Sequence, residues 1–270
     1  MNYGEIIIKG KSSKEILLST YICHPSMANN EISGPVVLTS ISRWLKKLKN
    51  RKYTYRIIFI PETIGSIAYI AKNLKSLKKN IIAGFNITCV GDNKFYSYIP
   101  SRNESTLSDK VALNILNFVD SKFIRYSWMD RGSDERQYCS PGIDLPVVTI
   151  CRSKFGSYKE YHTSLDNLNF ISQKGLETSF VLIKKIIQSI EYNCKPKCLT
   201  LCEPKMSDKK LYPTLSIKTN YEFSSNYMNI ITYSDGNHDL FDISNKINLP
   251  VEEINKLIIN LKNKKIIKLL

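Results

Sequence analysis

Short apolar runs alternate with amphipathic segments along the first two-thirds of this 270-residue chain. Runs typical of buried strands cover residues 15–22, 55–60, 81–90 and 145–151, and segments with helical spacing of apolar positions cover 34–49, 65–77, 107–119 and 171–192. Strands that alternate with helices favour an α/β sandwich, in which helices cover both faces of a mostly parallel sheet. In that architecture ligands bind beyond the carboxyl ends of the strands.

The last quarter of the chain has a different pattern. Residues 193–217 are polar and aperiodic and carry Pro and Cys, which predicts a linker. Helices are expected at 221–233, 240–248 and 251–263, followed by a strand at 264–270. This order is typical of a winged helix. We therefore predict an α/β domain over residues 1–192, a linker over 193–217 and a small winged-helix domain over 218–270.

Composition excludes several classes of protein. The chain has no apolar run near the ~20 residues that a membrane span needs, and no basic and apolar leader at its start. We therefore expect a cytoplasmic protein without a membrane partner. In that compartment the seven cysteines are expected to be reduced thiols. Cys194, Cys198 and Cys202 recur every four residues but lack the Cys-x-x-Cys pairs of structural zinc.

The net charge of +15 raises the question of a nucleic-acid partner. The lysines are spread along the chain, however, and Glu252 and Glu253 open the last predicted helix, where they would repel phosphate. We expect the winged helix to dock onto the main domain or a partner rather than to bind nucleic acid.

Two of the three histidines lie in loops that resemble halves of a metal site. His24 directly follows a predicted strand, and His162 lies in a loop after the last strand of the predicted sheet. Neutral imidazole is a common zinc ligand, and each such histidine needs a partner for its second ring nitrogen. The alternative is a pair of loop histidines with no metal.

Acidic residues accompany these histidines. Glu62 follows a strand and opens a helix, so it is a candidate base; a glutamate favoured there by the helix dipole is the alternative. Asp166 is expected to cap a helix or fix the loop behind His162. The charged stretch 130–138 is either a solvated loop or a loop that orders acids around a substrate ammonium group.

Four motifs of this chain, in the order in which they occur, resemble the motifs of a known family. They are His24 with Ala-Asn-Asn-Glu-Ile-Ser-Gly at 28–34, Pro-Glu-Thr-Ile-Gly-Ser at 61–66, Ser-Asp at 133–134, and Tyr-His-Thr at 161–163. From about Gly4 to Leu270 the chain resembles the bacterial leucyl-aminopeptidase type of zinc aminopeptidase. It is more similar still to a bacterial group with an aminopeptidase-like domain and a C-terminal winged helix, associated with surface-polysaccharide gene clusters.

The resemblance implies a metal site with departures. His24 and His162 match the first and last histidine ligands, and Asn30 falls where the aminopeptidases place a metal-bridging aspartate. Thr63 and Thr88 fall where two more carboxylate ligands are expected. Because an amide or a hydroxyl is a poor zinc ligand, a two-metal site is not expected. The implied site is a single zinc on the two histidines and one acid.

The resemblance implies a role for Glu62, and we assign further roles to other acidic and aromatic residues. Glu62 matches the catalytic glutamate, and Asp134 is the first choice for the third, acidic ligand. We expect Glu135, Glu160 and Tyr161 to contact the substrate, which would be a peptide or an aminoacylated small molecule. The resulting hypothesis is a zinc-dependent aminopeptidase-like hydrolase that cleaves an amide bond. The alternative hypothesis is a catalytically inactive binding or regulatory protein with the same fold.

The family proteins carry a further N-terminal segment that contributes to the peptidase domain. We therefore expect this chain to be a fragment, a split gene product or a shortened homologue. An oligomer or a complementing N-terminal chain is then a possible partner.

Overall fold

The computed structural model describes residues 2–205 and 218–270. The chain divides into two compact units, Met1–Ile187 and Gln188–Leu270. The boundary falls inside helix α5 (Gln173–Tyr192), so this one helix contributes residues to both.

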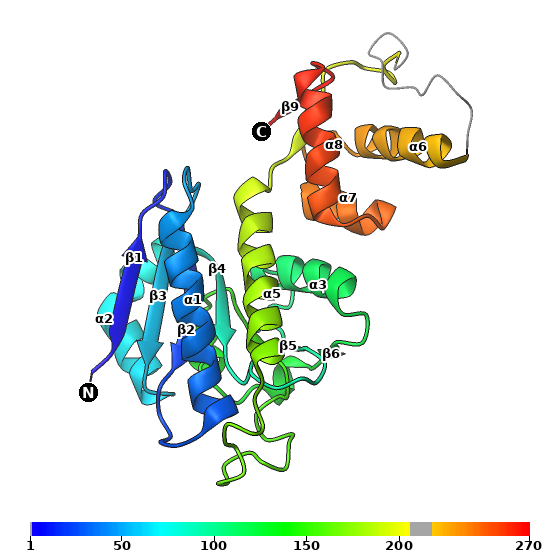
Figure 1. Cartoon of the computed structure of the whole chain (residues 1–270). Helices are drawn as coiled ribbons and strands as arrows, with labels where there is room; N and C mark the ends of the chain where they lie inside the picture. Colours follow the sequence, from blue (N-terminus) through cyan, green and yellow to red (C-terminus); the bar gives the residue numbers. More distant parts are fainter. Residues whose placement is uncertain (1, 206–217) are drawn as a thin grey trace. The chain divides into compact units, whose positions relative to one another are not determined.

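The first unit is built on a seven-stranded sheet with the order β1-β3-β2-β4-β7-β5-β6 (Figure 1). The strands are β1 (Gly4–Ile8), β2 (Glu15–Tyr21), β3 (Thr54–Ile60), β4 (Ile81–Ile87), β5 (Ser97–Ile99), β6 (Ile124–Arg125) and β7 (Val147–Cys151). The four central strands, β3, β2, β4 and β7, are parallel; β1 is antiparallel to β3, and β5 to β7. The predicted α/β architecture with a mostly parallel sheet is confirmed.

Helices cover both faces of this sheet. The longer ones are α1 (Ser33–Lys47), α2 (Ile64–Asn80), α3 (Leu107–Val119) and α5, and the short ones are the π-helix η1 (Ala28–Ile32), the 3-10 helix η2 (Trp128–Asp130) and α4 (Glu135–Tyr138). Figure 1 shows α1 and α5 across one face and α2 behind the other. Tyr69 and Leu77 of α2 pack on Leu17 and Ile58 of the sheet. All seven residues of β2 are buried because helices cover both of its faces.

The second unit contains α6 (Lys218–Thr232), α7 (Leu240–Ile247), α8 (Val251–Asn263) and the antiparallel pair β8 (Pro196–Cys198) and β9 (Ile267–Leu269). Asp239 begins α7 with a capping box, in which its side chain accepts from the main-chain N of Asp242 at 3.0 Å. Asn248 ends α7 in the left-handed conformation, with φ 51°. The three helices and the terminal strand confirm the predicted winged helix.

Several elements differ from the sequence predictions. β8 lies inside residues 193–217, which were assigned to a linker; residues 206–217 of that segment lie outside the described residues. The strand predicted over 81–90 ends at Ile87. The short elements β1, β5, β6, η1, η2 and α4 were not predicted. Within residues 2–205 and 218–270, no helix combines the length and the apolar character that crossing a membrane requires.

Candidate functional site

The two histidines meet at the carboxyl edge of the parallel strands. His24 follows β2 and His162 lies in the loop between β7 and α5. Their ring centroids are 4.5 Å apart and the rings are tilted by 45°. The fold therefore brings together the two loops that the sequence pointed to.

A buried carboxylate holds His24 in place. Oε1 of Glu31 lies 2.7 Å from Nδ1 of His24, and Oε2 accepts from the main-chain N of Cys23 at 2.7 Å. The side chain of Glu31 is only 4% exposed, against 34% for His24. A carboxylate can only accept this bond, so we assign the ring proton to Nδ1, which leaves Nε2 for another partner. Glu31 was not a predicted site residue, although it lies in the quoted motif at 28–34.

Hydrogen bonds to Asp166 connect the loop of His162 to the segment that follows His24. Its carboxylate accepts from the main-chain N of Asn29 at 2.6 Å and of Asn30 at 3.0 Å, and its main-chain O accepts from Ala28 N at 2.9 Å. These are the first main-chain donors of η1, so Asp166 caps that helix. Asp166 therefore acts on the site by positioning η1.

Both polar atoms of the Asn30 side chain form hydrogen bonds within the protein. Its Oδ1 accepts from the hydroxyl of Tyr21 at 3.1 Å, and its Nδ2 donates to Oε1 of Glu31 at 2.8 Å. Thr88 in turn donates to the Tyr21 hydroxyl at 2.5 Å. Asn30 is 2% exposed. The amide that stands where the resemblance places a metal-bridging aspartate is thus used within the protein, and it joins Glu31 to the core.

Glu62 lies on a strained turn between β3 and α2. Its Oε1 accepts from the hydroxyl of Ser133 at 2.9 Å. Burial raises the pKa of Glu62, and the charge of Glu31 raises it further, against the opposing effect of the Ser133 bond. The next residue, Thr63, has φ 62° and ψ −69°, a conformation that branched side chains rarely adopt. Strain of this kind is concentrated at functional sites.

Asp134 stabilises that turn. Its Oδ1 accepts from the main-chain N of Thr63 at 2.7 Å and from the hydroxyl of Ser66 at 2.8 Å. Burial raises the pKa of Asp134 to about 7. Its Oδ2 is buried and has no partner among the described residues.

Glu135 lies away from any open surface. It is fully buried, and Oε1 accepts from the main-chain N of Gly132 at 2.7 Å and of Ser133 at 3.0 Å. Its Oε2 accepts from the hydroxyl of Thr149 at 2.9 Å. The carboxylate predicted to contact substrate therefore orders the loop that positions Ser133 and Asp134.

The loop of His162 forms an aromatic wall. The ring of Tyr161 stacks on His162 at 3.9 Å, and burial raises the pKa of Tyr161 to about 12. Burial, followed by the charge of His24, lowers the pKa of His162, which favours its neutral form. Glu160 is half-buried, and its main-chain O accepts from Thr163 N at 3.1 Å. Tyr161 and His162 thus face the site together.

Two ring nitrogens are the potential zinc donors at this site. Catalytic zinc needs three protein ligands and an open position. Within the described part of the chain, no three His, Cys, Asp or Glu side chains are grouped so that they could hold a metal ion. His24 and His162 supply two nitrogens, Glu31 orients the first of them, and Asp134 is bonded to the start of α2. The described residues therefore do not fit a zinc site by themselves.

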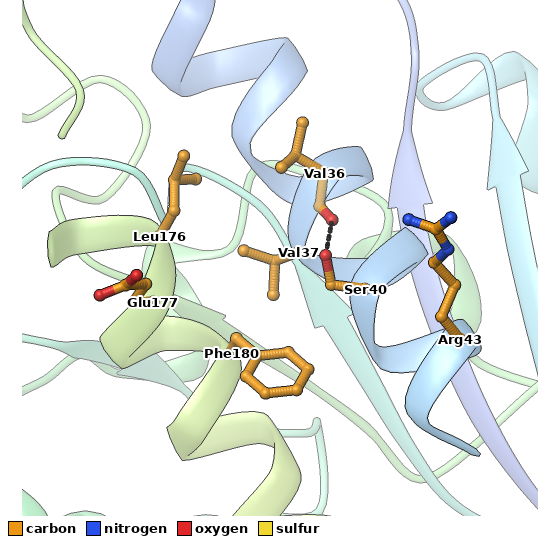
Figure 2. Close-up of a pocket in the computed structure, with 7 residues that line it drawn as sticks. All are labelled: Val36, Val37, Ser40, Arg43, Leu176, Glu177 and Phe180. Carbon is orange, nitrogen blue, oxygen red and sulfur yellow. Dashed lines mark hydrogen bonds between the residues drawn. The ribbon is translucent and has the colours of Figure 1, made fainter. Parts of the chain in front are cut away.

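A separate apolar hollow of about 340 Å³ lies between α1 and α5. Figure 2 shows Phe180 and Leu176 of α5 facing Val37 of α1 across it. The seven residues that line it include none of the predicted site residues. It is distinct from the histidine pair.

Comparison with known proteins agrees with this architecture. Residues 1–193 match the family described as a domain of unknown function, DUF4910, and residues 194–269 match a winged helix-turn-helix family. A Clostridium acetobutylicum protein, provisionally named a polysaccharide biosynthesis protein with an aminopeptidase-like domain, is 38% identical over 260 residues. The match covers 94% of this chain and 58% of that relative.

Solved structures show the same fold. The crystal structure of a provisionally named peptidase from Clostridium acetobutylicum superposes with a TM-score of 0.90 at 36% identity, over 99% of this chain and 60% of that one. A zinc aminopeptidase from Bacillus subtilis gives a TM-score of 0.57 at 17% identity, over 69% of this chain and 49% of that one. The chain therefore spans about three-fifths of the length of the relatives that it matches at more than 30% identity.

Proposed function

Because this chain belongs to the family described as a domain of unknown function, DUF4910, and has an aminopeptidase-like fold, we propose that it acts as a hydrolase on an amide bond. One observation carries the proposal: a carboxyl of raised pKa, Glu62, lies in the same site as two adjacent histidines. Carboxyl groups with a raised pKa beside other titratable groups are characteristic of catalytic sites.

Glu62 is the proposed proton-transfer group. It would take a proton from the attacking water and deliver it to the leaving amine. Its raised pKa brings the carboxyl nearer to the pH at which it must both accept and release a proton. The bond from Ser133 keeps its Oε1 in a defined position.

The two histidines have different proposed roles. Glu31 fixes His24 so that Nε2 points away from the Glu31 bond and can accept a hydrogen bond from substrate. His162, held neutral, can donate a ring N–H to the carbonyl oxygen as negative charge develops there. No step is assigned to zinc, because the described residues provide two nitrogen donors and no third ligand.

The proposed substrate is a peptide or an aminoacylated small molecule. The aromatic wall of Tyr161 and His162 suits a flat amide or an apolar side chain. The name of the Clostridium acetobutylicum relative supports a substrate from polysaccharide biosynthesis.

A second candidate function is substrate binding without turnover. The network of Asn30, Tyr21 and Thr88 favours it, since an amide and a hydroxyl stand where the resemblance implies carboxylate ligands. The purified full chain, incubated with a panel of aminoacyl-coumarin amides, distinguishes the two functions. Hydrolysis requires release of the fluorophore over many turnovers. Saturable binding of the same amides without release would support the second function.

A further inference from the structure

A cavity of about 450 Å³ lies at the β5–β6–β7 edge of the first unit. This volume is in the range of small-molecule sites. Three of its ten lining residues are cationic and none is acidic; they are Asn93, Lys94, Phe95, Ser97, Ile124, Tyr126, Arg152, Ser153, Lys154 and Ser157. The cavity therefore has a positive character.

Arg152 is the most buried of the three cations, with 7% of its surface exposed. Its guanidinium donates to the hydroxyl of Ser179 at 3.1 Å, to the main-chain O of Lys94 at 2.5 Å, and to the hydroxyls of Tyr96, at 2.9 Å, and Thr178. These acceptors are all neutral. Arginine usually pairs with carboxylate or phosphate when it is buried, and none of these four partners is acidic. The guanidinium also lies 4.1 Å from the centroid of the Tyr96 ring.

Asp92, which precedes the cavity residue Asn93 in the chain, already accepts three hydrogen bonds. Asp92 accepts from the main-chain N of Ser153 at 3.0 Å and of Lys94 at 2.7 Å, and it also accepts from Nδ2 of Asn29 at 3.1 Å. It holds two cavity segments in place. It does not line the cavity.

Two hydroxyls in the cavity wall have no partner. Ser97 is fully buried and Ser153 is 7% exposed, and neither Oγ has a hydrogen-bond partner among the described residues. A buried hydroxyl without a partner costs about 1–3 kcal/mol. Both serines line the cavity, so rotation about χ1 can turn each hydroxyl towards a ligand atom that completes its bonding.

Aromatic rings provide the rest of the wall. Lys154 lies over the ring of Tyr126 at 5.2 Å from its centroid, and Phe95 is 49% exposed. Planar or pyranose rings pack on such faces. Charged and aromatic groups are thus combined in one cavity.

We propose that this cavity binds a phosphate-bearing small molecule that also carries a ring. The phosphate would lie near Lys154 and Arg152 and accept from the hydroxyls of Ser97 and Ser153, and the ring would contact Phe95. Three cations match the double negative charge of a phosphate monoester better than the single charge of a carboxylate. The site does not depend on Glu62 or the histidine pair.

Isothermal titration of the full chain with glucose 1-phosphate, uridine monophosphate, inorganic phosphate and glucose tests the proposal. We expect saturable binding of at least one of the two ring phosphates, weaker binding of inorganic phosphate and none of glucose. Lys154→Gln should weaken the binding by about tenfold, the effect of one charged hydrogen bond. Lys72→Gln, which removes an exposed lysine of α2, controls for the net charge and should leave the affinity unchanged.

Ser97→Ala and Ser153→Ala separate ligand binding from folding. Each variant removes a hydroxyl that has no partner, so the midpoint of thermal unfolding should not fall. Each should nevertheless weaken binding of the ring phosphate several-fold, on the order of one neutral hydrogen bond.

The proposal is overturned if neither ring phosphate binds saturably, or if Lys72→Gln weakens binding as much as Lys154→Gln does. Equal affinity for inorganic phosphate and both ring phosphates would overturn the role assigned to Phe95 and Tyr126. Unchanged affinity in both serine variants would overturn the role of the two hydroxyls.

Discussion

Oε1 of Glu31 lies 2.7 Å from Nδ1 of His24, and this contact sets the direction of the ring. The same carboxylate also accepts from Asn30 and Cys23, so it is fixed on both oxygens. His24 is therefore oriented by a side chain that is itself immobile. Catalytic histidines commonly have such a hydrogen-bond partner on the ring nitrogen that does not react.

Glu31→Gln tests this orientation. The amide is a weaker acceptor and can present its NH₂ group to Nδ1, so we expect turnover to fall by about 10- to 100-fold. Nitrogen-15 spectra should also show His24 losing its preference for the Nδ1–H tautomer. An unchanged tautomer and full activity would contradict the role of Glu31.

Asp166→Ala should destabilise the first unit. The variant loses two bonds to the start of η1 and one from the hydroxyl of Tyr158, for a cost of about 2 kcal/mol or more. Urea denaturation measures this cost. Asp120→Ala is the matched control, since Asp120 also accepts two main-chain N–H groups but is less buried. An equal loss in both variants would argue against a special role for Asp166.

Because the pKa of Asp134 is raised in the folded protein, we expect its contribution to stability to depend on pH. Its pKa is about 7 in the folded protein and about 3.9 in an unfolded chain. Between these values only the folded state holds the proton, so the stabilisation from this group is lost as pH rises from about 4 to 7.

Asp134→Asn removes that dependence. The free energy of unfolding of the wild type, relative to the variant, should fall by on the order of 1 kcal/mol or more across this pH window. Denaturation curves at several pH values measure the difference. Asp130→Asn is the control; hydrogen bonds from Ser127 lower the pKa of Asp130, so its effect has the opposite sign. Parallel pH profiles for the wild type and Asp134→Asn would contradict the burial argument.

The donor set also predicts the metal content. With two histidine nitrogens and no third ligand among the described residues, the chain purified alone should keep well below one zinc per molecule after gel filtration. Mass spectrometry of the wild type, His24→Ala and His162→Ala measures this. One tightly held zinc in the wild type, absent from both variants, would show that a further ligand joins the pair.

The elements with strong periodicity were predictable from the sequence. The helix over 107–119 has the predicted bounds because Thr106 and Asp109 form a capping box at its start. β1 was not predicted because it is only five residues long and its three isoleucines follow one another without the polar alternation of a half-buried strand. β8 was not predicted because its partner strand, β9, lies about seventy residues further along the chain. Pairing at that distance leaves no local signal.

The positions of the main site residues were predictable from the sequence, but the directions of their side chains were not. Strand order places His24, Glu62 and His162 at one edge of the sheet, which sequence reasoning can anticipate. The direction of a side chain depends on contacts between distant loops. Glu135 and Asp134 are adjacent acids in one charged stretch, yet the fold buries both and uses them to hold loops. Glu31, on a π-helix turn, gave no separate signal.

The most direct test of the central claim is the turnover of an aminoacyl-coumarin amide by Glu62→Gln. The wild type should release fluorophore, and the variant should lose at least about a hundredfold in kcat with its fold intact, since it lacks the proton-transfer group. Glu253→Gln, an exposed glutamate of α8, should behave as the wild type. Equal turnover by Glu62→Gln and the wild type would remove Glu62 from the mechanism and contradict the account.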